Sequence, residues 1–305
     1  MKVFVTGATG FVGQEVMRHL IQAGHSIRFL TPHPGSNVAR QFEALDKAQA
    51  VPGDLDSAPL RDSMTGMDAV IHLVGIISEV GAKTFENIHS LGTANVVAAA
   101  QGAKLKKFVH MSALGTRKDA ISRYHKSKWA GEETVRQSGL DYTIFRPSLI
   151  YGPKDHFVNL FAKIIRWSPI VPVLGRADAK FQPVPVADVA TCFVKALTVP
   201  QSTASTFDLC GFETMTMPEL LDKILAAMGR HRLKLNVPLV IARIQAAFLE
   251  FLYPVLLRKA PPLNRDQLIM LQEDNIGNGE PARALFGLKQ NSFQQDIASY
   301  LGEKR

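Results

Sequence analysis

Apolar and polar residues alternate regularly over roughly the first 200 residues of the chain. Short apolar runs predict buried strands over 2–7, 26–30, 49–55, 68–75, 106–113 and the start of 141–153. Apolar residues at helical spacing predict helices over 14–25, 90–103, 124–139 and the second part of 181–197. Because strands alternate with helices and are apolar on both faces, the pattern predicts an α/β fold with a doubly wound parallel sheet.

The alternation weakens after about residue 150, which indicates a second and smaller lobe. Segments 153–183 and 207–305 have a mixed, more helical pattern. We therefore expect 1–152 with 184–206 to form the sheet domain. The two segments after residue 152 are expected to form a mostly helical C-terminal lobe that contacts the substrate or a partner.

One apolar segment of this lobe, 238–257, is open to two interpretations. Arg243, Gln245 and Glu250 interrupt it, so it is predicted to be amphipathic rather than membrane-spanning. The favoured interpretation is a helix that closes the substrate cleft with its apolar face in the core. If that face is exposed instead, a membrane surface or a hydrophobic substrate such as a quinone or prenyl lipid fits. The basic residues that flank the segment and would suit anionic lipid are Arg230, Arg232, Lys234, Arg258 and Lys259.

Composition narrows the class of protein. The apolar fraction of 46% is typical of a soluble globular chain, and the net charge of +8 would attract nucleic acid, anionic lipid or a phosphorylated cofactor. The sequence has no basic run with interleaved aromatic residues, which disfavours nucleic acid. Cys192 and Cys210 have neither a CxxC spacing nor a disulfide framework, which suits a reducing compartment. No secretory segment is predicted, so we expect a cytoplasmic protein, peripheral at the inner membrane face if 238–257 is exposed.

Three glycines close together carry the first chemical prediction. Gly7, Gly10 and Gly13 lie between a predicted strand and a predicted helix, in the segment TGATGFVG at 6–13. In such a loop the first glycine permits a tight turn, the second lets the backbone approach a pyrophosphate, and the third lets the helix pack on the strand. The helix N-terminus adds unpaired amides and partial positive charge. The pattern predicts a dinucleotide site rather than a glycine-rich turn without a ligand.

The second strand bears on the choice between NADP and NAD. An acidic residue after this strand would bind the ribose 2′-hydroxyl of NAD, but the segment FLTPHPGSN at 29–37 has none. Arg28, His33 and Arg40 are nearby basic residues that could meet a 2′-phosphate. This favours NADP, with NAD as the alternative.

A tyrosine and a lysine predict proton-transfer chemistry. Tyr124 and Lys128 are four residues apart on a predicted helix and therefore share a face. A nearby ammonium lowers the pKa of a phenol, which makes Tyr124 a proton donor and acceptor. Ser112 ends the fifth predicted strand, and its hydroxyl could donate to a substrate carbonyl. His19, His72 and His156 lack metal-ligand spacing, so no metal is expected.

These motifs together resemble the short-chain dehydrogenase/reductase family, in its extended branch related to NAD-dependent epimerases and dehydratases. Further members of the ordered set are GDL at 53–55, HLVG at 72–75, GTANV at 92–96 and RPSLIYGP at 146–153, over about the first 190 residues. The resemblance implies a Rossmann domain and catalysis by Ser112, Tyr124 and Lys128. It also implies that Asp54 of the GDL turn lies near the adenine, that Lys128 holds the nicotinamide ribose, and that the loop of Pro147 and Ser148 lies beside the nicotinamide. The cofactor-binding residues that it implies, in addition to the three glycines, are Thr9, Phe11, Val12, His33, Asp54, Leu55, Leu73, Val74, Gly75, Lys128, Pro147 and Ser148.

The chain departs from the extended enzymes at His89, where those enzymes usually carry asparagine. The separation between Ser112 and Tyr124 is also shorter than in sugar-nucleotide epimerases. Both departures disfavour a sugar-nucleotide substrate.

Segments 145–190 and 261–275 are similar to bacterial relatives of the NADPH-binding accessory subunit of mitochondrial respiratory complex I. This likeness extends over nearly the whole chain, and it implies contact with a respiratory complex and a nucleotide held structurally. Two hypotheses follow. The first is an NAD(P)-dependent oxidoreductase acting on a carbonyl, quinone or lipid-like substrate. The second is a non-catalytic NADP(H)-binding scaffold, or an assembly or accessory protein related to the respiratory complex I subunit or to quinone biosynthesis.

Overall fold

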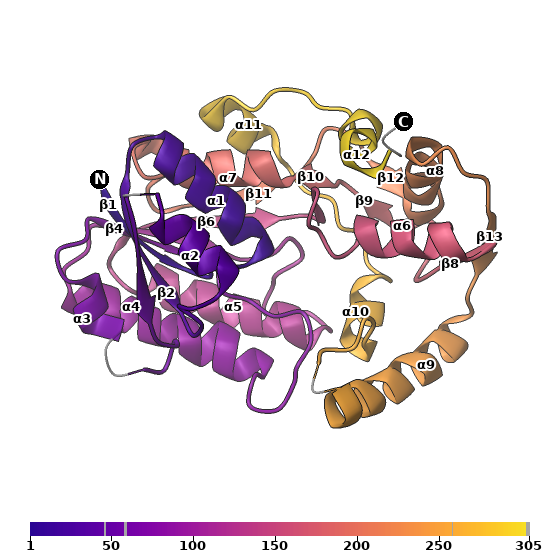
Figure 1. Cartoon of the computed structure of the whole chain (residues 1–305), viewed down its shortest axis with the longest axis horizontal. Coiled ribbons are helices and arrows are strands. Elements are labelled where there is room, and N and C mark those ends of the chain that lie inside the picture. Colours follow the sequence, from indigo (N-terminus) through magenta and orange to yellow (C-terminus); the bar gives the residue numbers. More distant parts are fainter. Residues whose placement is uncertain (46, 58–59, 258, 303–305) are drawn as a thin grey trace.

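A parallel sheet of seven strands organises the molecule. In the computed structural model, which describes residues 1–45, 47–57, 60–257 and 259–302, the strand order is β11-β6-β5-β4-β1-β2-β3 (Figure 1). The order reverses beside β1, which pairs with β2 on one side and β4 on the other. This is the predicted doubly wound Rossmann sheet. Its strands are β1 (Lys2–Thr6), β2 (Ser26–Thr31), β3 (Ala48–Pro52), β4 (Ala69–His72), β5 (Lys107–Met111), β6 (Asp141–Pro147) and β11 (Ser205–Leu209).

Helices cover both faces of the sheet because successive strand residues point to opposite sides. Val3 and Val5 lie in one core with residues of α1 (Phe11–Gln22), α2 (Asn37–Glu43), α7 (Val186–Lys195) and α11 (Glu280–Phe286). Phe4, between those valines, lies in the opposite core with residues of α3 (Leu60–Met64), α4 (Gly92–Gly102) and α5 (Arg123–Arg136). The alternation in a single strand therefore produces the three-layered domain.

The C-terminal lobe has a core of its own. Its elements are α6 (Val158–Trp167), β8 (Ile170–Val173), β9 (Lys180–Phe181), β12 (Met215–Thr216), α8 (Met217–Ala227) and α12 (Phe293–Leu301). Short strand pairs lie around it: β7 (Ile150–Tyr151) with β10 (Val184–Pro185), and β13 (Leu233–Asn236) with β8. The expected division after residue 206 falls inside β11, and α11 returns from this lobe to the Rossmann core.

Helix α9 (Leu239–Leu252) and the π-helical turn η3 (Tyr253–Leu257) form the segment with two interpretations. The favoured one, an apolar face buried in the core, is wrong. Only Ala242 and Ala246 of α9 are buried, and they pack on Leu268 of α10 (Arg265–Met270). Figure 1 shows α9 and α10 together at the bottom of the view, apart from α6, α8 and α12. Residues 239–257 are also long and apolar enough, by length and composition, to cross a membrane, with a mean hydropathy of 1.6. The polar interruptions in this segment had instead predicted an amphipathic helix that does not span a membrane.

Two short helical turns, one π-helical and one 3-10, occur in addition to the α-helices. The predicted helix over 90–103 begins earlier than expected, with the π-helical turn η1 (Glu86–Leu91) that runs directly into α4. This turn carries His89. A short 3-10 turn, η2 (Pro200–Ser202), precedes β11.

Candidate functional site

The loop after β1 has the form predicted from its glycines. Gly7 has a φ of +78°, and a methyl group there would lie 3.0 Å from the backbone of Leu73 and Val74. A methyl group on Gly13 would overlap the Gly7 carbonyl oxygen, so Gly13 permits α1 to approach the loop. Gly10 has more room, since its nearest neighbour would be the Gly7 carbonyl oxygen at 3.3 Å. Packing therefore demands glycine at position 10 much less than at position 13.

The N-terminus of α1 is available to an anion. Its N-cap residue is Gly10, no side chain caps its first turn, and that turn has no acidic residue. Thr9 is fixed because its carbonyl accepts a hydrogen bond of 3.0 Å from Gln14. Phe11 and Val12 begin the helix, and the Phe11 ring lies beside Gly152. Amides without a cap at a helix N-terminus, beside a loop free of side chains, fit a dinucleotide pyrophosphate.

The GDL turn, expected near the adenine, follows β3, and the HLVG segment begins at the last residue of β4. Leu55 is buried against Gly92 of α4, and Leu73 is buried after β4. The Asp54 carboxylate is exposed and accepts a 2.8 Å hydrogen bond from the Leu55 amide. The GDL turn and the HLVG segment thus both lie at the carboxyl edge of the sheet, and Leu73 and Val74 of HLVG lie directly beside Gly7 of the glycine loop.

The basic residues near β2 separate into two groups. Arg28 donates hydrogen bonds to the carbonyls of Ser63 and Thr65, at 2.7 and 3.2 Å, so its guanidinium is held at α3. The expectation that Arg28 is near a 2′-phosphate is therefore not met. His33 and Arg40 are exposed at the loop after β2 and at α2. A methyl group on Gly35 would lie 3.7 Å from the Arg40 guanidinium, so this cation lies over the loop.

Lys128 lies at the centre of the carboxyl edge. Its Nζ donates a 2.9 Å hydrogen bond to the Met111 carbonyl at the end of β5. A methyl group on Gly75, after β4, would lie 3.1 Å from the same Nζ, so glycine leaves room for the lysine there. Burial lowers the pKa of Lys128 to about 8, although the nearby Glu132 carboxylate favours the ammonium. At neutral pH Lys128 is a buried cation next to the predicted nicotinamide position.

Tyr124 lies in an aromatic environment that the sequence did not reveal. Its ring makes edge contacts with Phe85 at 5.8 Å, His89 at 5.3 Å and His125 at 5.4 Å between ring centroids. Burial raises the pKa of Tyr124, and the Asp266 carboxylate raises it further. This is opposite to the direction expected from Lys128, because burial of the phenol disfavours the charged phenolate.

His89 holds the loop after β4 against the Tyr124 helix. The Ile76 amide donates to His89 Nε2 at 3.0 Å, so in the neutral ring Nδ1 carries the proton. Nδ1 lies 2.8 Å from the Ser127 hydroxyl, which donates to the Tyr124 carbonyl at 2.8 Å. Burial, and then the Lys128 cation, lower the pKa of His89 to about 2. The histidine found in place of asparagine is thus a neutral bridge that positions the helix carrying Tyr124 and Lys128.

Ser112 and Ser148 follow β5 and β6. The Ser112 hydroxyl donates to Thr116 at 3.3 Å and is buried. The Pro147 carbonyl accepts from the Leu114 amide at 2.9 Å. The Ser148 hydroxyl donates to the Asn275 side-chain oxygen at 2.6 Å. Asn275, which the sequence analysis did not single out, thereby fixes the loop expected beside the nicotinamide.

A second contact from the same distant segment reaches the start of α5. The Asp266 carboxylate accepts from the amides of Arg123 and Tyr124, at 2.8 and 3.1 Å, and from the Ser122 hydroxyl at 2.8 Å. An anion is favourable at a helix N-terminus, where amides lack partners within the helix. Sequence reasoning missed Asp266 because its partners lie more than 140 positions away in the chain.

Other titratable groups belong to packing. His72 is buried between the hydroxyls of Thr6 and Thr93, at 2.7 and 3.1 Å. Cys192 and Cys210 are buried free thiols, as expected. No cluster of histidine, cysteine, aspartate and glutamate suitable for a metal ion occurs among the residues that the structure describes.

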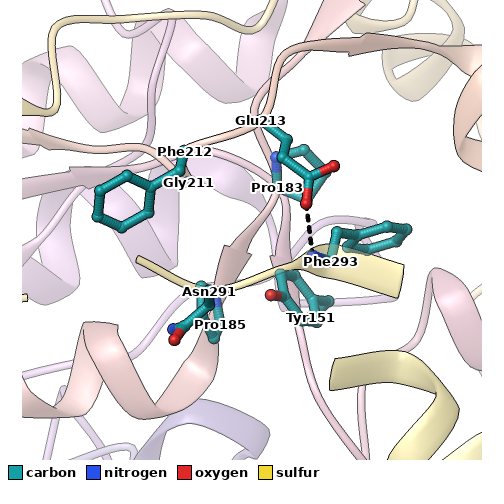
Figure 2. A pocket seen from close by; sticks show the side chains of 8 residues that line it. All are labelled: Tyr151, Pro183, Pro185, Gly211, Phe212, Glu213, Asn291 and Phe293. Atoms are coloured by element: carbon teal, nitrogen blue, oxygen red, sulfur yellow. Dashed lines mark hydrogen bonds between the residues drawn. The ribbon is translucent and has the colours of Figure 1, made fainter. Parts of the chain in front are cut away.

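Figure 2 shows a small pocket where β7 and β10 meet the C-terminal lobe. Its Glu213 carboxylate accepts from the Phe293 amide at 2.8 Å, and Tyr151 donates to Asp296 of α12 at 2.7 Å. The pocket contains none of the predicted site residues. Its lining residues are Tyr151, Pro183, Pro185, Gly211, Phe212, Glu213, Asn291 and Phe293.

Two known proteins are similar to this chain over more than half of its length. The "NADH dehydrogenase [ubiquinone] 1 alpha subcomplex subunit 9, mitochondrial" of Dictyostelium discoideum is 29% identical over 279 residues, covering 88% of this chain and 75% of that protein. A "Ceramide reductase" of Caulobacter vibrioides is 35% identical over 181 residues, covering 58% of this chain and 55% of that protein.

One solved structure shows the same architecture over nearly the whole chain. A UDP-glucuronic acid 4-epimerase from Bacillus cereus, in complex with UDP-glucuronic acid and NAD, superposes with a TM-score of 0.72 at 18% identity. The superposition covers 99% of both chains. The family model described as NAD(P)H-binding matches residues 7–200, from the glycine loop to the turn before β11. The chain therefore belongs to the NAD(P)H-binding family.

Proposed function

We propose that this protein is an oxidoreductase that reduces a carbonyl group of a hydrophobic substrate with NADPH. The observation that carries the proposal is the convergence at one edge of the sheet of the glycine loop, Gly75 and the buried Lys128 cation. A bound nicotinamide would supply the hydride. The residues of the chain would bind the cofactor, orient the carbonyl and supply the proton.

Each of the three predicted catalytic residues has a distinct role in this proposal. Ser112 would donate a hydrogen bond to the carbonyl oxygen. Tyr124 would give that oxygen its proton as the hydride reaches carbon, so that an alcohol forms. Lys128, cationic at neutral pH, would stabilise the phenolate left on Tyr124 and hold the nicotinamide ribose. The high pKa of Tyr124 means that the phenol is protonated before the reaction, as a proton donor must be.

Two features support NADPH rather than NADH. The loop after β2 contains no acidic residue, and the exposed His33 and Arg40 lie beside it. An arginine guanidinium binds a phosphate in a planar, bidentate geometry, whereas a ribose hydroxyl would favour a carboxylate.

A hydrophobic substrate is supported by the surroundings of Tyr124. Aromatic rings of Phe85, His89 and His125 contact it, and both histidines are held neutral because burial lowers their pKa values. The relative named for ceramide reduction is the most identical of those described above. A long-chain ketone is therefore the first substrate class to offer, and a quinone the second.

The second candidate function is a scaffold that binds NADP(H) without turnover. The specific observation in its favour is that relatives named as complex I subunits match over 88% of the chain, far beyond the glycine loop. In that case the nucleotide stabilises the folded state by mass action, and Tyr124 is a packing residue.

One set of variants separates the two functions. Tyr124→Phe removes one hydroxyl, so NADPH affinity by calorimetry should stay within about threefold while turnover of a long-chain ketone falls by about 10²–10⁴-fold. Lys128→Met should reduce both turnover and NADPH affinity. Tyr142→Phe, on β6 and outside the site, is the matched control and should behave as wild type.

Two results would contradict the proposal. One is tighter binding of NADH than of NADPH, which would overturn the cofactor choice. The other is wild-type protein that binds NADPH but turns over neither long-chain ketones nor quinones in detergent micelles. That second result would establish the scaffold.

A further inference from the structure

An apolar stripe runs along the outer side of α9. Val240, Ile244, Phe248 and Phe251 follow a spacing of four, four and three residues, so they share one side of the helix. Their exposed fractions are 67%, 67%, 60% and 70%. Further exposed apolar side chains flank the helix in sequence: Val255 and Leu256 in η3, and Leu233 and Leu235 in β13.

The opposite side of α9 explains why the stripe faces outward. Ala242 and Ala246 are buried against Leu268 of α10, and small residues there let the two helices approach closely. Glu250 fixes the far end, because it accepts hydrogen bonds from the Arg265 amide at 2.7 Å and from its guanidinium at 2.6 Å. The helix is therefore held to the protein by one side along its length, an arrangement suited to lying on a surface rather than crossing a bilayer.

The charge of the residues around α9 indicates which kind of partner the apolar stripe would bind. The sequence from 230 to 265 has seven lysine and arginine residues and a single acidic residue, Glu250, so it carries six of the chain's eight net positive charges. Glu250 is paired with Arg265, and Lys234 is paired with Asp222 of α8. Arg243 is exposed beside the stripe and Lys259 is exposed just after it, while Arg258 lies outside the described residues. An apolar stripe bordered by cations, without an unpaired anion, complements an anionic lipid surface.

We propose that the outer side of α9 docks in the plane of a bilayer that contains anionic phospholipid. Val240, Ile244, Phe248 and Phe251 enter the boundary between headgroups and acyl chains, and the basic residues lie among the headgroups. The proposal goes beyond the oxidoreductase function and does not depend on it, since a scaffold protein could dock in the same way. The docked helix packs on α10, and Asp266 of α10 accepts a hydrogen bond from the Tyr124 amide at the start of α5.

Vesicle flotation of the full chain tests the proposal. Wild type should float with phosphatidylcholine vesicles that contain phosphatidylglycerol, and much less with phosphatidylcholine alone or in high salt. Ile244→Glu with Phe248→Glu should reduce the bound fraction at least about tenfold, because charged side chains would enter the acyl boundary. Arg243→Glu should weaken binding to the anionic vesicles only. Leu45→Glu, an exposed leucine outside α9, is the matched control and should float as wild type.

NADPH titration and thermal melting of every variant check that the fold is intact. Because the substituted side chains are exposed, the NADPH affinity and the melting temperature of each variant should equal those of wild type. Wild type that floats no better than the Ile244→Glu, Phe248→Glu variant overturns the proposal. It is also overturned if vesicles capture nothing while light scattering shows a dimer that this variant abolishes, because the stripe would then bind a second copy of the chain.

Discussion

At the scale of single residues, Gly10 and Gly13 are both glycine but for different physical reasons. A methyl group at Gly13 would overlap backbone atoms of Gly7 and Ala8, whereas one at Gly10 would be only slightly close to the Gly7 carbonyl oxygen. Gly13 therefore serves packing, whereas packing does not account for glycine at position 10, and we propose that Gly10 is needed for the cofactor. The sequence predicted these two roles from the order of the glycines, and the structure adds the backbone atoms that leave no room for a methyl group at Gly13.

This difference predicts opposite outcomes for two variants. Gly10→Val should leave the thermal midpoint near that of wild type and weaken NADPH binding more than tenfold, because its side chain would lie over the amides of α1. Gly13→Ala should destabilise the fold by about 1–3 kcal/mol or more, since backbone must move to admit the methyl group. Calorimetric titration and thermal melting measure the two effects. NADPH affinity unchanged in Gly10→Val would remove the glycine loop as the cofactor site.

Tyr124 shows what single-residue reasoning from sequence leaves out. The spacing to Lys128 correctly placed both side chains on one helix that reaches the carboxyl edge of the sheet. The pKa of the phenol was expected to fall, but burial raises it. The Tyr124 phenol is desolvated by contact with Phe85 and His89, which lie at the turn before α4. The sequence around Tyr124 does not indicate that these two rings contact it.

At the scale of elements, the helix that carries Tyr124 is completed by a segment from the other lobe. Asp266 lies at the start of α10 and caps α5 through two backbone amides and Ser122. Because α10 also packs on α9, these three helices form a continuous connection from the exposed stripe to the site.

Removing this cap should loosen the start of α5. Asp266→Ala should cost about 1–2 kcal/mol, because a charged acceptor at a helix N-terminus is lost, and Asp266→Asn should cost less. Hydrogen exchange should accelerate over 122–125 and 265–270. Asp178→Ala, which removes an exposed carboxylate paired with Arg176, should change stability by less than about 0.5 kcal/mol. Unchanged exchange at 122–125 in Asp266→Ala would mean that the cap does not hold α5.

The success of prediction differs among elements for a physical reason. The six strands up to β6 and the helices α1, α4, α5 and α7 were predicted because the periodicity of their apolar residues reflects burial, whichever element covers them. Helix α1, for example, packs on α7, which is far away in the chain. Helix α9 was assigned to the core because its composition resembles that of a core helix, yet only two alanines are buried. The return of 264–275 to the site was not predicted, since it depends on contacts with residues far away in the chain.

At the scale of the whole molecule, three buried histidines link the stability of the Rossmann domain to pH. His72 and His110 stack at 5.4 Å between neighbouring strands β4 and β5, and His89 lies nearby on η1. Burial lowers the pKa of His72 to about 3 and that of His89 to about 2, and it lowers the pKa of His110 well below 6.5. Neither ring nitrogen of His110 has a hydrogen-bond partner among the described residues.

These histidines should make the protein acid-sensitive. They are neutral in the folded state but take up protons near pH 6.5 when unfolded, so stability is retained above this pH and is lost as pH falls below it. The loss approaches about 1.4 kcal/mol per pH unit for each histidine. Urea unfolding at pH 7, 6 and 5 measures the slope. His110→Leu should make the slope shallower by one proton without breaking a hydrogen bond, whereas His156→Leu, at an exposed histidine, should leave it unchanged. Equal slopes in wild type and His110→Leu would show that His110 does not resist protonation in the folded protein.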